Sequence, residues 1–450
     1  MQTRFTPVQL ENDRLTEANA ILRKCVHCGL CTATCPTYVL LGDERDSPRG
    51  RIYLIKDMLE SGGRASPEVT HHVDRCLTCL SCMTTCPSGV DYMHLVDIAR
   101  QHIEKSGRRS IRSRMMRRVL AMTLPYPGRF RLGLLAAALF RPLRRLLGKA
   151  GFGELAAMLE LAPAPWALFG GRRAQAAPAG EIRGRVIMLE GCAQKVLRPD
   201  INAATVRLLS RMGYEVVTAR DAGCCGALVQ HMGRERKAIS QARRNVDAWW
   251  QIVSAGPLDA IVINASGCGT MVKDYGHLLK GRAQYERKAV HIAALTKDIS
   301  EFLAGFDLGP PKRWSSLRIA YHSACSMQHG QRVSEPPREL LRKAGFAVVE
   351  IPEGHICCGS AGTYNLLQPE LAGRLLERKV GNIALVKPDI IATGNIGCIT
   401  QLQSGTAIPV VHTVELLDWA YGGPCPRGLE QLEDRVSDVP DPGVLAPAAE

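Results

Sequence analysis

Sixteen of the seventeen cysteines in this 450-residue chain stand in groups whose spacing suits metal binding. Eight of them form two runs, CVHCGLCTATCP at residues 25–36 and CLTCLSCMTTCP at residues 76–87. Both runs have the spacing C-x2-C-x2-C-x3-C-P. Cysteines this close together are awkward partners for disulfides, because their side chains must surround one point. A metal cluster requires that arrangement, so the runs indicate clusters.

The spacing is the one that holds [4Fe–4S] clusters in bacterial ferredoxins. The first three cysteines of a run reach one cubane, and the fourth is carried by the turn to the other cluster. We therefore expect two clusters with exchanged ligands. Cluster 1 takes Cys25, Cys28, Cys31 and Cys86, and cluster 2 takes Cys76, Cys79, Cys82 and Cys35. A pair of zinc sites is the weaker alternative, since zinc usually takes two separated CxxC hooks.

The remaining grouped cysteines lie in a region where short apolar runs alternate with helical patterns. VIMLE at 186–190 and IVINAS at 261–266 read as strands, and helices are expected near 201–213 and 234–253. This alternation favours a mostly parallel sheet with helices on its faces.

The α/β region occurs twice. Three pairs of cysteines recur at separations of 133, 133 and 130 residues, namely Cys192 and Cys325, Cys225 and Cys358, and Cys268 and Cys398. In both copies 31 residues separate the first cysteine from the Cys-Cys pair. We predict two copies of one domain, copy 1 at 184–300 and copy 2 at 316–422.

Each copy has four thiols near the expected carboxyl ends of strands, where open α/β sheets bind ligands. We predict a further site for an iron–sulfur cluster or a zinc in one or both copies. Its ligands would be Cys192, Cys224, Cys225 and Cys268, or Cys325, Cys357, Cys358 and Cys398. Gly226 and Gly359 would allow close backbone approach to the metal. The alternative is that these cysteines are remnants of duplication, buried as small apolar groups.

The Cys…Cys-Cys-Gly…Cys domains resemble the cysteine-rich domain of heterodisulfide reductases and succinate dehydrogenase relatives, which ends in CxxC and can bind a noncubane [4Fe–4S] cluster. Here GTM follows Cys268 and ITQ follows Cys398, so the last cysteine is missing from both copies. The whole arrangement resembles the iron–sulfur subunits of glycolate oxidase from about residue 20 to about residue 420. The stretches CVHCGLCTATCPTYVLLGDE, AGCCGA and CCGSAGTY carry this resemblance.

The resemblance implies a subunit that relays electrons from glycolate oxidation, which yields glyoxylate, to a quinone-type acceptor. Iron–sulfur clusters cannot take a hydride, and the sequence has no GxGxxG after an expected strand and no P-loop. We therefore expect FAD on partner subunits, and no catalysis by the lone chain. Two alternatives stay open: the equivalent subunit of a glycerol-3-phosphate or lactate dehydrogenase complex, and a thiol/disulfide-active reductase at the Cys-Cys-Gly sites.

The net charge of +14 is concentrated in residues 105–173, which hold 15 Lys and Arg but only two acids, Glu154 and Glu160. The apolar stretch LGLLAAALF between Arg131 and Arg141 is too short to cross a bilayer. We expect residues 105–149 either to lie on an anionic membrane or to dock on an acidic partner. Nucleic-acid binding is not expected, because the charge lies in one connector without a recognised nucleic-acid fold.

These patterns predict an α+β multidomain chain. A helical ferredoxin-like two-cluster module at 1–105 is followed by a basic, Pro/Ala-rich connector at 106–183, the two α/β cysteine-rich copies and a disordered tail at 423–450. The polar N-terminus has no apolar signal region. We expect a cytoplasmic protein, with peripheral contact at the inner face of the cytoplasmic membrane.

Overall fold

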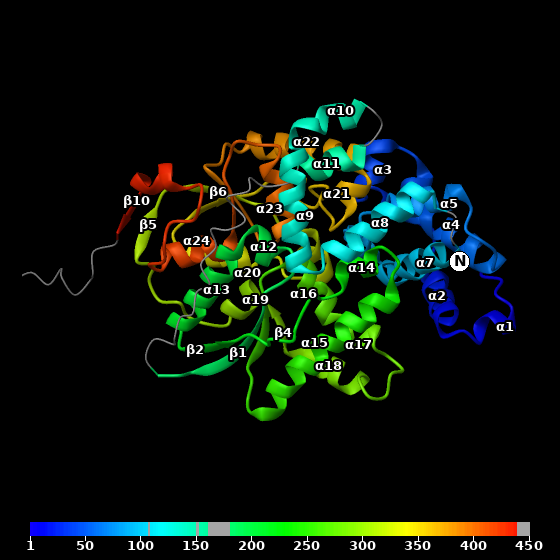
Figure 1. The fold of residues 1–450 in the computed structure, drawn as a ribbon, viewed down its shortest axis with the longest axis horizontal. Helices are drawn as coiled ribbons and strands as arrows, with labels where there is room; N and C mark the ends of the chain where they lie inside the picture. The colour runs from blue at the N-terminus through cyan, green and yellow to red at the C-terminus, as the bar shows by residue number, and fades with distance from the viewer. Residues whose placement is uncertain (107–108, 150–152, 161–180, 439–450) are drawn as a thin grey trace, which may run out of the picture.

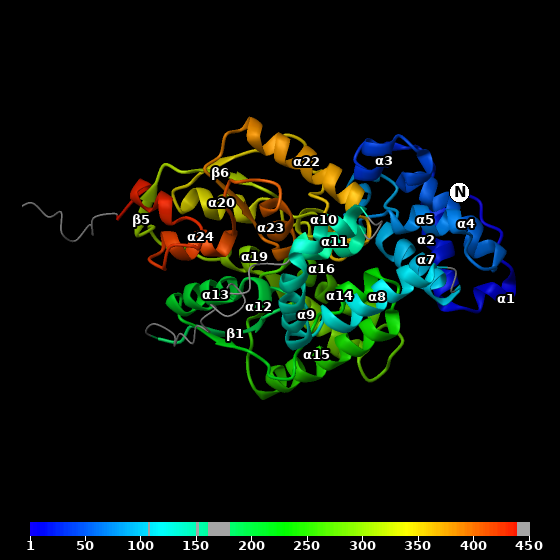
Figure 2. The same cartoon turned by 45° about the horizontal axis from the view of Figure 1, so that its top comes forward.

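The computed structural model describes residues 1–106, 109–149, 153–160 and 181–438. The N-terminal module lies at one end of the long axis, and the two α/β copies lie side by side toward the other end (Figures 1 and 2). The predicted α+β fold, a helical cluster module followed by two α/β domains, is confirmed.

The N-terminal module is helical throughout. Its α-helices are α1 (Pro7–Leu10), α2 (Asp13–Lys24), α3 (Pro36–Leu41), α4 (Pro48–Ser61), α5 (Pro67–Asp74), α6 (Ser81–Thr85) and α7 (Tyr92–Ser106), with short 3-10 helices η1 (Leu30–Thr32) and η2 (Glu44–Asp46). Helices α2, α4, α5 and α7 bury one face each in a common core, and the two cysteine runs lie in the loops and short helices between them.

Helix α4 shows how the sequence sets these elements. The Ser47 hydroxyl accepts a hydrogen bond from the Gly50 backbone N–H (2.9 Å), which caps the helix start. Gly62 ends the helix in the left-handed conformation that glycine tolerates. Ile52, Ile55 and Leu59, which recur at helical spacing, are buried in the core of the module.

The described part of the basic connector forms four α-helices and a 3-10 turn: α8 (Ile111–Thr123), α9 (Pro127–Phe140), η3 (Arg141–Leu143), α10 (Arg144–Lys149) and α11 (Gly153–Glu160). Leu120 and Ala121 of α8 are fully buried in the core of copy 1, and Leu134 of α9 packs against Val196. One face of the connector therefore packs against copy 1. The Pro/Ala-rich stretch 161–180 lies outside the described residues. Within the ranges that the structure describes, no helix is long and apolar enough to span a membrane.

Copy 1 contains a four-stranded parallel sheet of order β2-β1-β3-β4. Its central strand β3 is apolar and buried along its whole length, as parallel strands covered on both faces are. Its elements are β1 (Gly184–Leu189), α12 (Gln194–Leu197), α13 (Pro199–Arg211), β2 (Tyr214–Val217), α14 (Ala227–His231), α15 (Glu235–Ala255), β3 (Ala260–Ile263), α16 (Ser266–Lys273), α17 (Tyr275–Leu278), α18 (Glu286–Leu295), β4 (Thr296–Asp298) and α19 (Ile299–Leu303).

Copy 2 repeats this topology, with a parallel sheet of order β7-β6-β8-β9. Its elements are β5 (Arg313–Ser315), β6 (Arg318–Tyr321), the π-helix η5 (Ser326–Gln331), α20 (Pro336–Lys343), β7 (Ala347–Val349), α21 (Tyr364–Leu367), α22 (Pro369–Leu385), β8 (Ile390–Thr393), α23 (Ile396–Gln403), β9 (Val410–His412) and α24 (Thr413–Ala420). The matching strand orders agree with the duplication inferred from the cysteine spacing.

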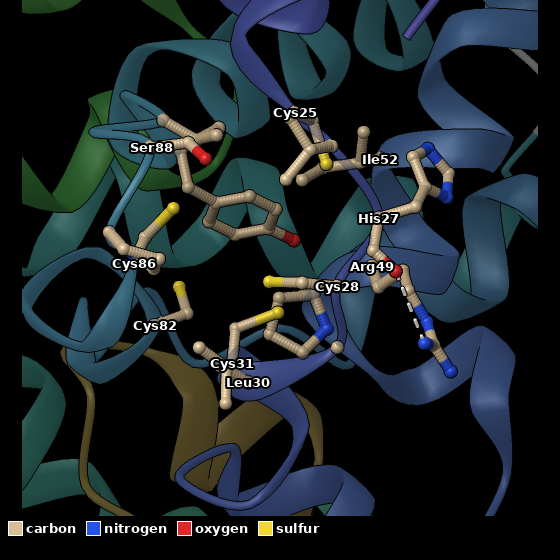
Figure 3. Close-up of a pocket in the computed structure, with 16 residues that line it drawn as sticks. Cys25, His27, Cys28, Leu30, Cys31, Arg49, Ile52, Cys82, Cys86 and Ser88 are labelled. Carbon is tan, nitrogen blue, oxygen red and sulfur yellow. Dashed lines mark hydrogen bonds between the residues drawn. The ribbon is translucent and has the colours of Figure 1, made fainter.

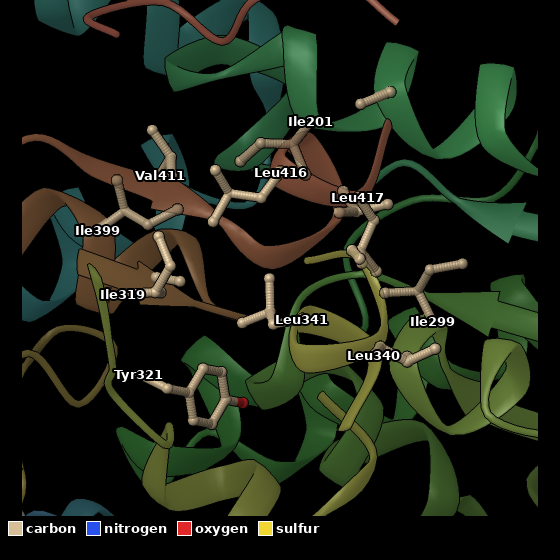
Figure 4. Packing of buried hydrophobic residues seen from close by; sticks show 14 of the residues in the cluster. Ile201, Ile299, Ile319, Tyr321, Leu340, Leu341, Ile399, Val411, Leu416 and Leu417 are labelled. Atoms are coloured by element: carbon tan, nitrogen blue, oxygen red, sulfur yellow. The ribbon is translucent and has the colours of Figure 1, made fainter. Parts of the chain in front are cut away.

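The two copies share one hydrophobic core. Ile201 of copy 1 and Ile319 and Leu417 of copy 2 belong to the same buried cluster (Figure 4). Beside it, Arg207 and Arg211 of α13 form ion pairs with the buried Asp418 of α24. We therefore propose that the boundaries 184–300 and 316–422 mark sequence repeats rather than units that fold alone.

The C-terminal segment differs from the disordered tail expected from residue 423. Residues 423–438 include the 3-10 helix η6 (Glu430–Arg435) and strand β10 (Val436–Asp438), which pairs antiparallel with β5. Leu429 is fully buried in the shared core. The polar composition of the segment did not indicate these contacts, because they involve few residues: the buried Leu429 and the three residues of β10. Residues 439–450 lie outside the described residues.

A cluster of charged side chains joins the N-terminal module to copy 1. His94 of α7 donates to Asp91 (2.6 Å) and to Asp274 of copy 1 (3.0 Å). His277 of α17 stacks on His94, with ring centroids 3.6 Å apart, and pairs with Glu17 of α2. Burial opposes the charge on His94, but hydrogen bonds and charges from Asp274 and Asp91 prevail and raise its pKa to about 10.

A His94→Gln variant tests this contact. Because folding raises the pKa of His94, its stabilisation is complete below the ordinary pKa of 6.5 and is lost as pH rises towards about 10. We expect the variant to melt at least roughly 3 °C lower at pH 6 and to lose less stability than the wild type between pH 7 and 10. Thermal unfolding of anaerobically purified protein measures this. A His102→Gln control on the same helix should follow the wild type, and parallel pH profiles of wild type and His94→Gln would refute the assignment.

Candidate iron–sulfur sites

The first cavity in the N-terminal module, called here the cluster 1 cavity, lies between the two cysteine runs. The thiols that line it include those of Cys25, Cys28, Cys31 and Cys86 (Figure 3). The Arg49 guanidinium donates to the backbone carbonyl of His27 (3.4 Å) and holds the first loop against α4. Cys28 is exposed, so this cavity lies near the surface.

The second cavity, the cluster 2 cavity, is lined by Cys35, Cys76, Cys79 and Cys82. Cys35 thus stands with the second run and Cys86 with the first, as ligand exchange requires. Cys82 lines both cavities, which are therefore adjacent. All seventeen cysteines lie in described ranges and none forms a disulfide. Two neighbouring sets of four free thiols fit the donor set of two [4Fe–4S] clusters.

Both cysteine loops wind in the same way. In each, the second and fourth residues after the first cysteine have positive φ. These are His27 (φ 58°) and Gly29 (φ 83°) in the first loop, and Thr78 (φ 53°) and Leu80 (φ 66°) in the second. A β-branched threonine rarely adopts this conformation, and such strain is concentrated at functional sites. The shared winding turns three thiols of each run toward one centre.

A buried ionic network lies beside the cluster 2 cavity. Arg51 of α4 is 1% exposed and donates to Asp46 (3.1 Å), to the His72 carbonyl (2.7 Å) and toward the Cys35 sulfur (3.9 Å). Burial disfavours its charge, but Cys76, Tyr92, Cys35 and Asp46 together raise the pKa of Arg51. Its position places a permanent positive charge where thiolate ligands bring negative charge into the protein.

Burial favours the protonated form of three cavity thiols, those of Cys31, Cys79 and Cys82. Burial raises the pKa of Cys31 to about 11, with further contributions from neighbouring thiols. Burial also raises the pKa values of Cys79 and Cys82 well above the ordinary range. Since thiolate is the ligand form, binding iron must release these protons.

The thiols of each α/β copy form a second kind of site. In copy 1 the sulfur atoms of Cys192 and Cys224 lie 3.6 Å apart, and Cys225 continues the contact to Cys268 at the start of α16. In copy 2 the corresponding chain of sulfur contacts runs through Cys325, Cys357, Cys358 and Cys398. The structure thus brings together each set of four predicted from the sequence.

The glycine after each Cys-Cys pair allows the loop to pack closely on a helix. Gly226 and Gly359 both have left-handed φ values, 99° and 92°. A Cβ at Gly359 would lie 2.6 Å from the Ala372 carbonyl oxygen, and one at Gly226 would lie 3.2 Å from that of Ala238. These glycines let the cysteine loop pass close to a long helix of the same copy, α15 for Gly226 and α22 for Gly359.

The cluster 2 loop packs directly on the cysteines of copy 2. Leu77 shares a buried cluster with Cys357 and Ile356, and Cys79 and Cys325 pack against that cluster. The Tyr364 hydroxyl of copy 2 donates to the Arg75 carbonyl in the module (3.0 Å). The sites therefore follow one another from the exposed cluster 1 cavity, through the buried cluster 2 cavity, to copy 2.

Sequence comparisons agree with this arrangement of sites. Residues 24–90 match the "4Fe-4S dicluster domain" family, and residues 186–273 and 319–403 each match the "Cysteine-rich domain" family. The lactate utilization protein A of Oceanobacillus iheyensis is 28% identical over 243 residues, 52% of this chain and 96% of that protein.

Two relatives match nearly the whole chain. The glycolate oxidase iron-sulfur subunit of Escherichia coli (strain K12) is 43% identical over 420 residues, 93% of this chain and 99% of its own length. The probable glycolate oxidase iron-sulfur subunit of Bacillus subtilis (strain 168) is 30% identical over 451 residues, 94% of this chain and 99% of its own length. The resemblance found in the sequence is confirmed, and the chain belongs to the family of glycolate oxidase iron–sulfur subunits.

Proposed function

We propose that this chain is the electron-transfer subunit of a glycolate oxidase complex, taking electrons from FAD on a partner subunit and delivering them to a quinone-type acceptor. Oxidation of glycolate to glyoxylate releases two electrons and two protons, and a quinone takes up the same number to form a quinol. Iron–sulfur clusters carry one electron at a time. The observation that carries the proposal is the line of thiol sites from surface to interior.

The surface around the cluster 1 cavity supports entry of electrons there. Cys28 is exposed, and Val26, Leu30 and Tyr53 beside it are 67%, 56% and 57% exposed. Exposed apolar side chains grouped at a redox site are typical of a docking surface. We propose that the flavin-bearing partner binds here, with Cys25, Cys28, Cys31 and Cys86 holding cluster 1.

An apolar cavity of about 220 Å³ supports delivery to a quinone. It lies between the connector and both copies, and Leu134, Leu197 and Leu366 are among its apolar walls. Ser360 and Gly397, next to the cysteine loops of copy 2, also line it. An apolar pocket with few polar groups suits a quinone ring.

The outer face of the connector supports peripheral contact with an anionic membrane through residues 105–149. Nine of the eighteen large hydrophobic side chains exposed in the described residues lie between Ile111 and Leu146. Leu139 is 80% exposed and Leu146 is 64% exposed. Apolar side chains interspersed with arginines are typical of helices at a membrane surface.

The alternatives have less support. The lactate utilization relative matches only 52% of this chain. A disulfide reductase would need accessible, acidic thiols. Cys224, Cys225, Cys357 and Cys358 are all at most 5% exposed, and neighbouring thiols together with burial raise their pKa values. Further iron–sulfur binding in the cysteine-rich copies remains part of the proposal, with zinc as its alternative.

Ligand exchange predicts paired spectroscopic effects. Cys35→Ser should alter the same EPR signal as Cys79→Ser, because both residues serve cluster 2. Cys86→Ser should instead match Cys28→Ser, in cluster 1. EPR of anaerobically purified, dithionite-reduced protein makes the comparison. If Cys35→Ser matches Cys28→Ser, each run holds its own cluster and the exchange is wrong.

The division of labour predicts that the lone chain does not oxidise glycolate with a dye acceptor. Co-expression with the flavin-binding subunits should yield a complex that reduces a quinone analogue at the expense of glycolate. Replacing Leu30 and Tyr53 by Gln should weaken assembly of this complex, and Leu385→Gln, on the exposed face of α22, is the matched control. Glycolate oxidation by the chain alone would overturn the proposal.

Membrane contact predicts binding to anionic vesicles that falls with salt. A variant with Gln at Leu139, Phe140 and Leu146 should bind phosphatidylglycerol vesicles at least about tenfold less, since three apolar side chains are withdrawn from the interface. Co-sedimentation at low and high salt measures this. Leu385→Gln again serves as the control, and equal binding by the triple variant and the wild type would exclude this surface.

A further inference from the structure

The two sets of repeat cysteines have different surroundings. In copy 1 the Cys-Cys pair is held by neutral groups that satisfy one another. Asn245 donates to the Cys224 carbonyl (3.1 Å) and to the Tyr275 hydroxyl (3.0 Å), and that hydroxyl donates to the Cys225 carbonyl (2.8 Å). Cys225 also belongs to the hydrophobic core of copy 1. These contacts hold the loop without a metal.

Copy 2 has a lysine where copy 1 has this asparagine. The glycine of each Cys-Cys-Gly loop packs on an alanine, Ala238 in copy 1 and Ala372 in copy 2. Seven residues after that alanine stand Asn245 and Lys379, and both are fully buried. Lys379 therefore puts a positive charge at the place of a neutral amide.

Lys379 lies beside the thiols of copy 2. Its charge interacts with Cys325, Cys358 and Cys357, and less strongly with the carboxylate of Glu353. The ammonium donates to the Glu353 carbonyl (2.8 Å), and among the described residues it forms no ion pair with a carboxylate. A buried cation is costly unless an anion offsets it. The thiols are the groups nearby that become anionic when they bind metal.

A buried histidine also sets copy 2 apart. His322 stands three residues before Cys325, where copy 1 has Leu189 three residues before Cys192. The side chain of His322 is buried, and neither ring nitrogen has a hydrogen-bond partner. A ring nitrogen of His322 and the sulfur atoms of Cys358 and Cys398 all lie within 4.8 Å of one another. Buried polar groups are rarely left unpaired, so this nitrogen requires a partner.

We propose that copy 2 alone holds a third iron–sulfur centre, bound by Cys325, Cys357, Cys358 and Cys398 and by a ring nitrogen of His322. Lys379 offsets the negative charge of the thiolate-bound cluster. Copy 1, with Leu189 and Asn245 at the corresponding places, holds none. The inference rests on the proposed electron-transfer function, because the centre adjoins the cluster 2 loop and thereby extends the relay.

Five donors favour a cluster over a zinc ion. A single zinc ion takes four ligands in a tetrahedron, so one of the five would be left over, whereas a cluster spreads its ligands over several iron atoms. Gln401, three residues after Cys398, is not available as a ligand, because it accepts from Asn365 (2.9 Å) and donates to the Ala372 carbonyl (3.3 Å). The ring nitrogens of His322, in contrast, are unpaired, and one lies within 4.8 Å of the sulfur atoms of Cys358 and Cys398.

Metal analysis of the anaerobically purified full chain tests the assignment to copy 2. We expect about twelve iron atoms per chain, about eight after Cys358→Ala, and no change after the matched copy 1 variant Cys225→Ala. Circular dichroism checks that both variants fold. About eight irons in the wild type, zinc in place of the extra iron, or iron loss only in Cys225→Ala would each overturn the proposal.

Pulsed EPR tests His322 directly. Labelling histidine with ¹⁵N should change a nitrogen hyperfine coupling on the third centre. His322→Cys should keep the iron and lose that coupling, whereas His322→Leu should lose about a third of the total iron. Retention of iron with an unchanged coupling in His322→Leu would exclude ligation. Signals from clusters 1 and 2 are read in the same samples: their absence would refute the proposed function, whereas their presence without a third signal would refute this inference alone.

Discussion

Burying thiolate-bound clusters brings negative charge into the protein, and the rest of the structure depends on how that charge is offset. Arg51 is almost fully buried beside Cys35 and is itself held by Asp46. Lys379 is fully buried beside the thiols of copy 2. A buried charge without a partner costs several kcal/mol. Arg51 has the carboxylate of Asp46 beside it, and the proposed third centre would place an anion beside Lys379.

The cysteine loops must also bring several thiols to one point. The two cysteine runs do this with left-handed residues at the same two positions, although the second run has Leu80 where the first has Gly29. The copies do this differently, by bringing loops from separate strands to the carboxyl edge of a parallel sheet. The thiol sets of the module can be predicted from a short cysteine motif, whereas those of the copies can be predicted only from the internal repeat.

This difference decides how much the sequence could predict. The four-thiol sets, the helical module and the paired α/β copies follow from cysteine spacing and apolar periodicity. The roles of Arg51, His322 and Lys379 could not be predicted in this way, because none of these residues belongs to a cysteine motif. A residue-by-residue comparison of the copies would have found the last two, since His322 replaces Leu189 and Lys379 replaces Asn245. The ordered segment 423–438 depends on a few tertiary contacts, which amino-acid composition cannot predict.

The two copies depend on each other structurally. They share one core, and Asp418 of copy 2 pairs with two arginines of copy 1, so neither copy could be lost without exposing the other. Copy 1 also carries the contacts of His94 and His277 that join the module. Neutral hydrogen bonds from Asn245 hold the cysteine loop of copy 1. The buried cation Lys379 lies instead in copy 2, the copy that packs on the cluster 2 loop. If copy 2 holds the proposed centre, both copies position the module and copy 2 also extends the line of redox sites.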